Sequence, residues 1–297
     1  MERPMKKIAL LILVVCVPAV NAQELKNISV HGHRGTRGTR PEDTLPAFAE
    51  ALRAGVDVLE MDMAVTKDGV VVISHDPHIT PERCLGADGN KLGQQVAISS
   101  LTLEEVKKYD CGSIPNPNFP QQVLVPGTKI PTLDEMFDMV KASTYPAAAK
   151  VEFNIETKIF PSEPQLSPSP AEFAKLVAGV VRKHGMEHRT IVQSFDVRTL
   201  REIKLIEPGI LTSQLTYEEL LDFVPSLKSS KTDIWSPCYK WTTADSIKAM
   251  HAAGIKVAPW TLNTPEEWTA AIKDGVDAII TDYPADLIDW LRAKKLR

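Results

Sequence analysis

The 297-residue sequence lacks three features that mark common classes of protein. It has no excess of basic residues, because 34 Lys and Arg stand against 38 Asp and Glu for a net charge of −4. Nucleic-acid-binding domains are usually basic, so this balance argues against nucleic acid as a partner. After residue 22 no apolar run approaches the roughly 20 residues that span a bilayer, and no internal repeat is present. We therefore expect neither an integral membrane protein nor a repeat protein.

Cysteine is scarce as well. Of the four cysteines, Cys16 lies in the N-terminal apolar run, which leaves Cys84, Cys111 and Cys238 downstream. In an oxidising compartment Cys84 and Cys111 could pair across a loop-rich segment, and the alternative is two unpaired thiols. We expect the disulfide. Cys238 lies in the strand-like run IWSPCY, where it is most simply a buried small apolar residue.

The first 22 residues have the pattern of a secretory signal peptide. Arg3, Lys6 and Lys7 precede an apolar run over 8–17, and Val20–Ala22 supplies a small-residue cleavage site. Removing residues 1–22 takes away three basic residues and one acidic residue, which leaves 275 residues with a net charge of about −6. We therefore expect an exported protein, periplasmic or secreted, whose functional domain spans 23–297.

Strand-like and helix-like segments alternate along this domain. The segment VVISHD (71–76) follows the tight turn TKDG and should return antiparallel to the strand before it. Capping boxes at Thr132/Glu135 and Thr264/Glu267 mark two of the helix starts. Eight strands then remain, each coupled to a helix, over 28–33, 56–63, 151–157, 190–195, 211–215, 234–239, 256–262 and 277–281. This pattern predicts an α/β fold, a (β/α)8 TIM barrel, with a doubly wound open sheet as the alternative.

The region 77–131 does not fit this alternation. It is rich in Gly, Pro and polar residues and contains one short capped helix near 102–109. Long excursions of this kind are usually functional. We expect a small subdomain inserted after the β-hairpin that carries His75.

Candidate catalytic side chains fall at the predicted carboxyl ends of strands, where barrels of this type place their active sites. The first strand ends in His33-Arg34, and the hairpin return ends in His75-Asp76. The segment VEFNIETK (151–158) carries polar residues at alternate positions, which share one face of a strand. Because unpaired charges are costly to bury, that face should line a polar site.

Three carboxylates could bind a metal ion at this site. Glu60 and Asp62 share a face of the second strand, and Glu156 lies on the next. Three oxygen ligands suit a hard cation such as Ca²⁺ or Mg²⁺ better than zinc. The alternative is an ion network in which Arg34 and Lys158 neutralise these acids.

Seven short motifs resemble the glycerophosphodiester phosphodiesterase family. They are HRG (33–35), PEDT (41–44), GVDVLEMDMAVTKDGVVVISHD (55–76), NIETK (154–158), QSF (193–195), PWTLN (259–263) and DGVDAIITDYP (274–284). Together they cover nearly the whole of 23–297. The resemblance implies an eight-stranded α/β barrel with a small insert after the second histidine.

The same resemblance implies roles for individual residues. His33 and His75 would form the acid–base pair, Arg34 and Lys158 would contact the phosphate, and Glu42 would help to hold the Arg34 loop. The acids Glu60, Asp62 and Glu156 would bind one divalent cation, Ca²⁺ or Mg²⁺.

Other residues near these motifs have less specific roles. Asp43 departs from the family pattern, which usually has Asn there, so hydrogen bonding in this loop should differ. Phe195 and Trp260, at predicted strand ends, either pack against the glycerol of the substrate or belong to the barrel core. Arg37 and Arg40 are expected to be solvated or to help attract the substrate.

We therefore expect an exported, metal-dependent phosphodiesterase that converts small glycerophosphodiesters to glycerol 3-phosphate and an alcohol. In the mechanism that the resemblance implies, a glycerol hydroxyl attacks phosphorus while one histidine takes its proton and the other protonates the departing alcohol. A cyclic phosphate is then hydrolysed with the two roles reversed. Two alternatives remain open. One is a lysophospholipase D-like or sphingomyelinase D-like enzyme, and the other is a barrel that binds phosphorylated ligands without catalysis.

Overall fold

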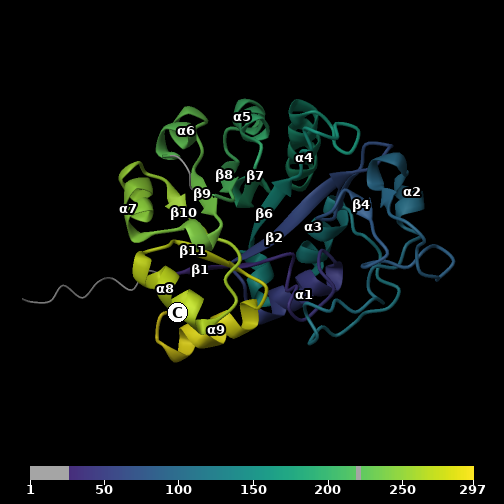
Figure 1. The fold of residues 1–297 in the computed structure, drawn as a ribbon, viewed down its shortest axis with the longest axis horizontal. Helices are drawn as coiled ribbons and strands as arrows, with labels where there is room; N and C mark the ends of the chain where they lie inside the picture. The colour runs from purple at the N-terminus through teal and green to yellow at the C-terminus, as the bar shows by residue number, and fades with distance from the viewer. Residues whose placement is uncertain (1–26, 219–221) are drawn as a thin grey trace, which may run out of the picture.

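Eight parallel strands form a barrel at the centre of the molecule (Figure 1). The computed structural model describes residues 27–218 and 222–297, so the predicted signal peptide lies outside the described residues. Neighbouring strands follow the order β10–β9–β8–β7–β6–β2–β1–β11. Their bounds are β1 (Ser29–Gly32), β2 (Val58–Val65), β6 (Glu152–Thr157), β7 (Thr190–Ser194), β8 (Leu211–Thr216), β9 (Ile234–Pro237), β10 (Lys256–Val257) and β11 (Ala278–Thr281). The predicted barrel is confirmed.

The barrel closes between its last two strands through the backbone. Asp277 N donates to Val257 O at 2.9 Å, and Ile280 N donates to Pro259 O at 3.1 Å. The strand predicted over 256–262 is wrong in its length, because β10 ends at Val257. Pro259 has no N–H to donate to a sheet ladder, so regular pairing stops before it.

Each barrel strand leads to a helix that packs on the outside of the barrel (Figure 1). The predicted capping boxes are present: Thr132 and Glu135 begin one helix, and Thr264 and Glu267 begin another. The helices are α1 (Leu45–Ala54), α3 (Leu133–Ala142), α4 (Pro170–His184), α5 (Val197–Ile206), α6 (Val224–Ser229), α7 (Ala244–Ala252), α8 (Pro265–Asp274) and α9 (Pro284–Ala293). Four 3-10 turns are η1 (Ile98–Ser100), η2 (Pro146–Ala149), η3 (Glu187–Arg189) and η4 (Tyr239–Trp241).

The predicted hairpin and insert follow β2. Strand β3 (Val71–Ile73) pairs antiparallel with β2, as expected. The chain then leaves the barrel until α3 and forms β4 (His78–Ile79), β5 (Val96–Ala97) and the short helix α2 (Leu103–Val106), seen at the right of Figure 1. We call residues 77–131 the insert. A disulfide joins Cys84 to Cys111 within it, whereas Cys238 is a free, buried cysteine.

The apolar core lies between the barrel strands and the helices. All eight residues of β2 are buried, because a strand of a closed parallel barrel is covered on both faces. The rings of Phe137 from α3 and Phe153 from β6 meet edge to face, with centroids 4.9 Å apart. Among the described residues, no helix combines the length and the hydropathy needed to cross a bilayer. The inside of the barrel, in contrast, carries polar side chains.

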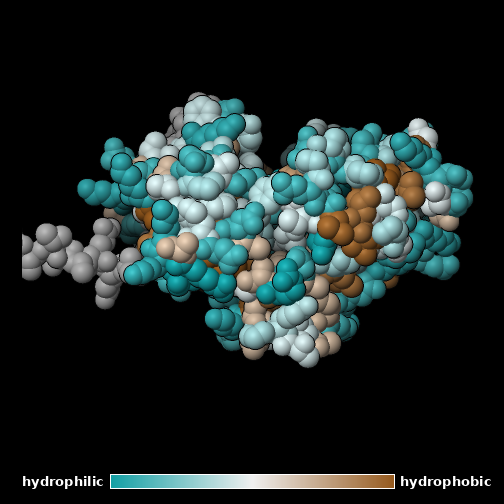
Figure 2. Space-filling model, turned by 90° about the horizontal axis from the view of Figure 1, so that it is seen from below, coloured by the Kyte–Doolittle hydropathy of each residue, from teal (hydrophilic) through white to brown (hydrophobic). Residues whose placement is uncertain are grey.

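The surface is largely hydrophilic on the face seen from below (Figure 2). Hydrophobic residues gather there mainly in one patch, on the side of the molecule that carries the insert. Val123 of the insert is 58% exposed.

The loop between β1 and α1 depends on a glycine. Gly35 has a φ of +83°, a left-handed conformation that side chains disfavour. A Cβ added there would lie 2.7 Å from the carbonyl carbon of Ala47 and 2.9 Å from the N of Phe48, both in the backbone of α1. Only glycine lets the loop pack this closely against the helix.

We predict that Gly35→Ala lowers the free energy of unfolding by about 1–3 kcal/mol, because it adds both backbone strain and a steric clash. The matched control is Gly179→Ala in α4, where a Cβ meets no atom within 4 Å. That change should stabilise the protein by up to about 1 kcal/mol. Urea unfolding of both variants measures the difference. Equal midpoints for the two variants would contradict the prediction.

Candidate active site

A cavity of about 370 Å³ opens at the carboxyl ends of the barrel strands. One part of its wall is polar and consists of His33, Arg34, Arg37, Glu60, His75, Glu156, Lys158 and Gln193. The rest is largely apolar and consists of Phe195, Leu215, Trp260, Thr261 and Ile280. Most of the residues selected from the sequence therefore meet in one cavity, at the end of the barrel where they were expected.

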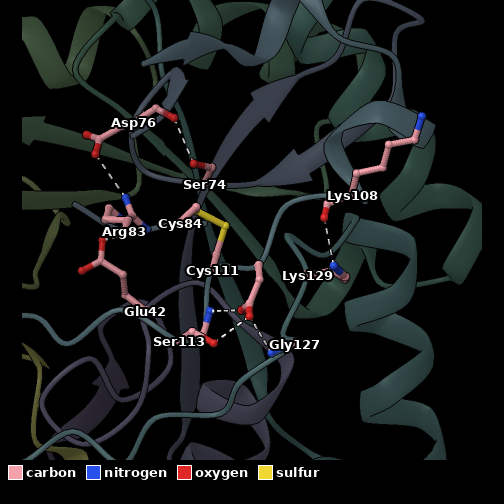
Figure 3. Close-up of a disulfide and its surroundings, with 12 residues drawn as sticks. Glu42, Ser74, Asp76, Arg83, Cys84, Lys108, Cys111, Ser113, Gly127 and Lys129 are labelled. Carbon is pink, nitrogen blue, oxygen red and sulfur yellow. Dashed lines mark hydrogen bonds and ion pairs between the residues drawn. A yellow bond between two sulfur atoms is a disulfide. The ribbon is translucent and has the colours of Figure 1, made fainter. Parts of the chain in front are cut away.

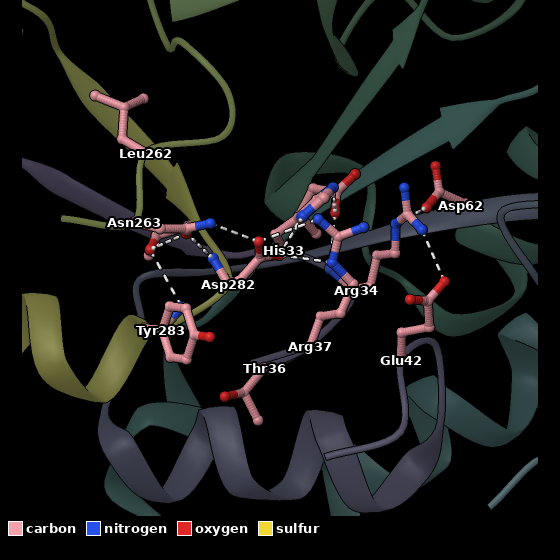
Figure 4. A network of polar contacts seen from close by, with 12 residues as sticks. His33, Arg34, Thr36, Arg37, Glu42, Asp62, Leu262, Asn263, Asp282 and Tyr283 are labelled. Carbon is pink, nitrogen blue, oxygen red and sulfur yellow. Dashed lines mark hydrogen bonds and ion pairs between the residues drawn. The ribbon is translucent and has the colours of Figure 1, made fainter. Parts of the chain in front are cut away.

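His33 follows β1 and is fixed by a carboxylate from the last strand. Its Nδ1 lies 2.7 Å from Oδ1 of Asp282, directly after β11 (Figure 4). Asp282 also accepts hydrogen bonds from Nε of Arg37 at 2.8 Å and from Nδ2 of Asn263 at 2.7 Å. Burial alone would raise the pKa of Asp282, but His33 and Arg37 hold it well below its usual range. An ionised Asp282 accepts from Nδ1–H of His33, so the Nε2 lone pair is free.

The second histidine is held in the same way. Nδ1 of His75, at the end of the hairpin return, lies 2.9 Å from Oδ1 of Asp76. The hydrogen bond with His75 lowers the pKa of Asp76 well below its usual range, with further help from Arg83. The His75 side chain is 34% exposed, against 11% for that of His33. Burial lowers the pKa of both imidazoles, that of His33 to about 4.

The three acids converge at the floor of the cavity. One oxygen from each of Glu60, Asp62 and Glu156 lies within 4.8 Å of the others. Nζ of Lys158 lies 2.7 Å from Glu156 and 3.1 Å from Asp62, and Nε of Arg34 lies 3.1 Å from Asp62. The ion network of these acids with Arg34 and Lys158, which was the alternative to a metal site, is therefore present.

The electrostatics of this floor favour an added cation. Burial and the neighbouring Asp62 raise the pKa of Glu60 well above its usual range, and burial raises that of Glu156 to about 8. Burial would also raise the pKa of Asp62, but Lys158 and Arg34 keep it well below its usual range. Three carboxylates against two cations leave one negative charge in excess. Because one carboxylate oxygen from each of three acids lies within 4.8 Å of the other two, this oxygen-only set fits a divalent cation.

Two uncharged side chains from the barrel interior orient Glu60. Nε2 of Gln193 donates to Oε1 of Glu60 at 2.6 Å, and Nδ2 of Asn154 donates to Oε1 of Gln193 at 2.9 Å. The backbone N of Arg34 donates to the other oxygen of Glu60 at 2.9 Å. Both oxygens of Glu60 are therefore held in one orientation, as a residue that could bind a cation requires.

Comparison with known proteins identifies the family of this chain. The family model described as "Glycerophosphoryl diester phosphodiesterase family" matches residues 33–286. The chain belongs to this family. It is 32% identical to a glycerophosphodiester phosphodiesterase of Caldanaerobacter subterraneus subsp. tengcongensis over 89% of this chain and 97% of that protein. A solved structure from Silicibacter pomeroyi DSS-3 superposes with a TM-score of 0.82 and 31% identity, covering 89% of this chain and 94% of that one.

Another relative is named for a different substrate. A lysophospholipase D of Homo sapiens is 26% identical over 87% of this chain and 84% of that protein. The family and the named glycerophosphodiester phosphodiesterases among its relatives establish this chain as a phosphodiesterase of that family.

The cavity of this phosphodiesterase also has an aromatic wall. The rings of Phe195 and Trp260 meet edge to face with centroids 5.9 Å apart, and Tyr217 lies 6.1 Å from Trp260. Nε1 of Trp260 donates to the backbone O of Ser236 at 2.9 Å, which fixes the indole. Phe195 is 50% exposed, so it is not a core residue.

Arg37 corrects one expectation from the sequence. Its side chain is only 19% exposed and donates two hydrogen bonds to Asp282, so it is not solvated. Asp282 and Gln193 were not selected from the sequence, although both lie inside matched motifs. The rule that active groups follow barrel strands would have identified Asp282, since it comes directly after β11. Glu42 does contact Arg34, whose Nη1 donates to Oε1 of Glu42 at 2.7 Å.

Asp43, which replaces the family's usual Asn, is buried and has a φ of +56°. Its two carboxylate oxygens accept no hydrogen bond from the described residues. Burial and then Asp62 raise its pKa well above the usual range, against the opposing effect of Arg34. The folded pKa is thus above the unfolded one. The stability that Asp43 contributes is present below the unfolded pKa and is lost as the pH rises through the folded pKa.

We predict that Asp43→Asn stabilises the metal-free protein by about 1–3 kcal/mol at pH 7.5 and by less at pH 4.5, because Asn cannot ionise. Asn also tolerates a positive φ. Urea unfolding in chelator at both pH values measures the effect. The control Asp138→Asn, at a side chain that is 69% exposed, should change stability by no more than about 0.5 kcal/mol. An equal gain from Asp43→Asn at both pH values would disprove the explanation.

Proposed function

We propose that this chain is a metal-dependent phosphodiesterase that cleaves small glycerophosphodiesters with His33 and His75 as its acid–base pair. One observation carries the proposal. Both imidazoles line the same cavity, and the Nδ1 atom of each lies beside a carboxylate, at 2.7 Å and 2.9 Å. Each ring therefore presents Nε2 for proton transfer, which is the arrangement that acid–base catalysis requires.

Charge balance supports the metal requirement. A cation bound by Glu60, Asp62 and Glu156, Ca²⁺ or Mg²⁺, would offset the negative charge that grows on the phosphate oxygens. With two added positive charges, the floor formed by these acids with Arg34 and Lys158 changes from net negative to net positive. Only the positive floor attracts a phosphodiester anion.

The two histidines divide the proton transfers according to their surroundings. His33 is the more buried, and its Nε2 lies 3.9 Å from Oε2 of Glu60. We assign it as the base that takes the proton of the attacking glycerol hydroxyl as the new O–P bond forms. His75, which is partly exposed, gives a proton to the departing alcohol as the old P–O bond breaks. In the second stage water opens the cyclic phosphate, and each histidine reverses its role.

The cavity also bears on substrate size. At about 370 Å³ it lies at the lower end of the range for small-molecule sites. Phe195 and Trp260 provide apolar surface for the carbon skeleton of glycerol or of the alcohol. Exposed Tyr217 extends this surface outward, which favours lysophospholipase D activity as a second candidate function.

We predict that purified protein hydrolyses glycerophosphocholine in the presence of Ca²⁺ or Mg²⁺ and releases glycerol 3-phosphate. Excess chelator should lower kcat by about 100-fold or more, since the cation supplies several kcal/mol of charge stabilisation. A coupled assay of glycerol 3-phosphate measures both rates. Full activity in chelator would exclude the metal requirement, and no turnover of any glycerophosphodiester would exclude the substrate class.

The same assay separates the remaining candidates. A higher kcat/KM for lysophosphatidylcholine than for glycerophosphocholine would identify a lysophospholipase D. His33→Ala should lower kcat by about 10²–10⁴-fold while glycerol 3-phosphate still binds. Equal, negligible turnover by the wild type and His33→Ala would instead indicate a barrel that only binds.

Export is the last part of the proposal. The predicted signal peptide and cleavage site over 1–22 support it, and the Cys84–Cys111 disulfide is typical of an oxidising compartment. We predict that protein recovered from its own host begins at Gln23. N-terminal sequencing of the cell-envelope and medium fractions tests this, and an intact N-terminus in the cytosolic fraction would contradict it.

A further inference from the structure

We propose that Arg83, in the insert, is a positioning residue that holds Arg34 and His75 in place at the same time. It would act on Arg34 through Glu42 and on His75 through Asp76. The proposal rests on the function proposed above, in which these two side chains bind phosphate and transfer protons. It gives the insert a direct part in building the active site.

The first link joins Arg83 to the phosphate-binding side. Nη2 of Arg83 lies 3.0 Å from Oε1 of Glu42, and the same oxygen accepts a hydrogen bond from Nη1 of Arg34 at 2.7 Å. One carboxylate oxygen thus bridges two guanidinium groups. Burial alone would raise the pKa of Glu42, but Arg83 and Arg34 together hold it at about 2. Glu42 therefore stays ionised in a largely buried position because two arginines, Arg83 and Arg34, are beside it.

The second link joins Arg83 to the acid–base side. Nη1 of Arg83 donates to Oδ2 of Asp76 at 3.2 Å, and Oδ1 of the same carboxylate lies 2.9 Å from Nδ1 of His75. Both oxygens of Asp76 are engaged, so Arg83 fixes the plane of the carboxylate that orients the imidazole. Figure 3 shows the Arg83 side chain between Asp76 and Glu42.

The resulting series of side-chain contacts runs from Arg34 through Glu42, Arg83 and Asp76 to His75. It connects the β1–α1 loop with the segment after β3, two parts of the site that come from different βα units. The Arg83 side chain is 24% exposed and that of Glu42 is 10% exposed, so water screens this ion pair only partly. The side chain of Asp76 is 40% exposed, so its pair with Arg83 is screened more. Side chains in such supporting positions typically change function by 10–100-fold when they are removed.

The insert fixes the position of Arg83. The backbone N–H groups of Arg83 and Cys84 both donate to Thr80 O, which closes a turn. Cys84 is 4% exposed, and its disulfide ties this turn to Cys111, whose N donates to Thr128 O at 2.8 Å. The guanidinium is therefore presented by an anchored backbone and not by a free loop.

The first test is steady-state kinetics of Arg83→Gln with the full-length, metal-loaded enzyme. We expect KM to rise, because Arg34 loses support, and kcat to fall, because His75 loses support, with kcat/KM lower by about 10–100-fold. Arg83→Lys should lose less, since one ammonium group can reach one of the two carboxylates. The control Arg182→Gln removes another arginine–carboxylate pair, with Glu207, at an exposed position on α4 and should leave both constants unchanged.

A double-mutant cycle separates positioning from general destabilisation. Asp76→Asn removes the link from Arg83 to His75 and leaves the link to Arg34 intact. Adding Arg83→Gln to Asp76→Asn should therefore raise KM further, with a kcat close to that of Asp76→Asn alone. Glu42→Gln removes the link from Arg83 to Arg34. In that background Arg83→Gln should lower kcat with little further change in KM. The affinity for glycerol 3-phosphate, measured by calorimetry, tests the link to Arg34 even if the wild type proves inactive.

Two outcomes would overturn the proposal. One is an Arg83→Gln protein that folds with its disulfide intact and keeps the kcat, KM and glycerol 3-phosphate affinity of the wild type. The other is an effect of Arg83→Gln on kcat that stays undiminished in the Asp76→Asn background. A wild type that hydrolyses no glycerophosphodiester would overturn the proposed function, and unchanged product binding in Arg83→Gln would then decide against the positioning role.

Discussion

The excess of buried negative charge at the carboxyl end of the barrel constrains the rest of the site. Glu60, Asp62 and Glu156 lie on two adjacent strands, and within the described residues Arg34 and Lys158 form their closest ion pairs with lysine or arginine. Carboxylates so close together in a buried site cannot all stay ionised without more positive charge. Burial, followed by the negative charge of Asp62, raises the pKa values of two of them. A site balanced in this way is suited to binding a cation and a phosphodiester together.

The pairing of the first and last strands of the barrel brings together a second group of site residues. His33 and Asp282 are 249 positions apart, yet β1 and β11 pair side by side, so the residues that follow the two strands meet. Arg37 completes the cluster from the same loop as His33. The orientation of the imidazole therefore depends on the parallel pairing of the first and last strands, β1 and β11.

The insert contacts the site from the other side. The aromatic ring of Phe119 lies 4.8 Å from the guanidinium of Arg37, and Nε2 of Gln122 donates to the backbone O of the same arginine at 2.6 Å. Arg83, within the same insert, contacts Glu42. The insert thus contacts the β1–α1 loop at two residues, Arg37 and Glu42. These contacts give the insert a structural role beside the site.

The sequence by itself determined the features that depend on near neighbours. Alternation along a strand placed Glu60 and Asp62 on one face, caps marked helix starts, and strand ends located His33. Tertiary structure alone decided which distant groups meet. It paired Asp282 with His33, made Arg37 a partly exposed partner of Asp282 and not a free surface charge, and ended β10 early. Local periodicity reports burial along one element, whereas these contacts depend on how strands far apart in sequence are registered against one another.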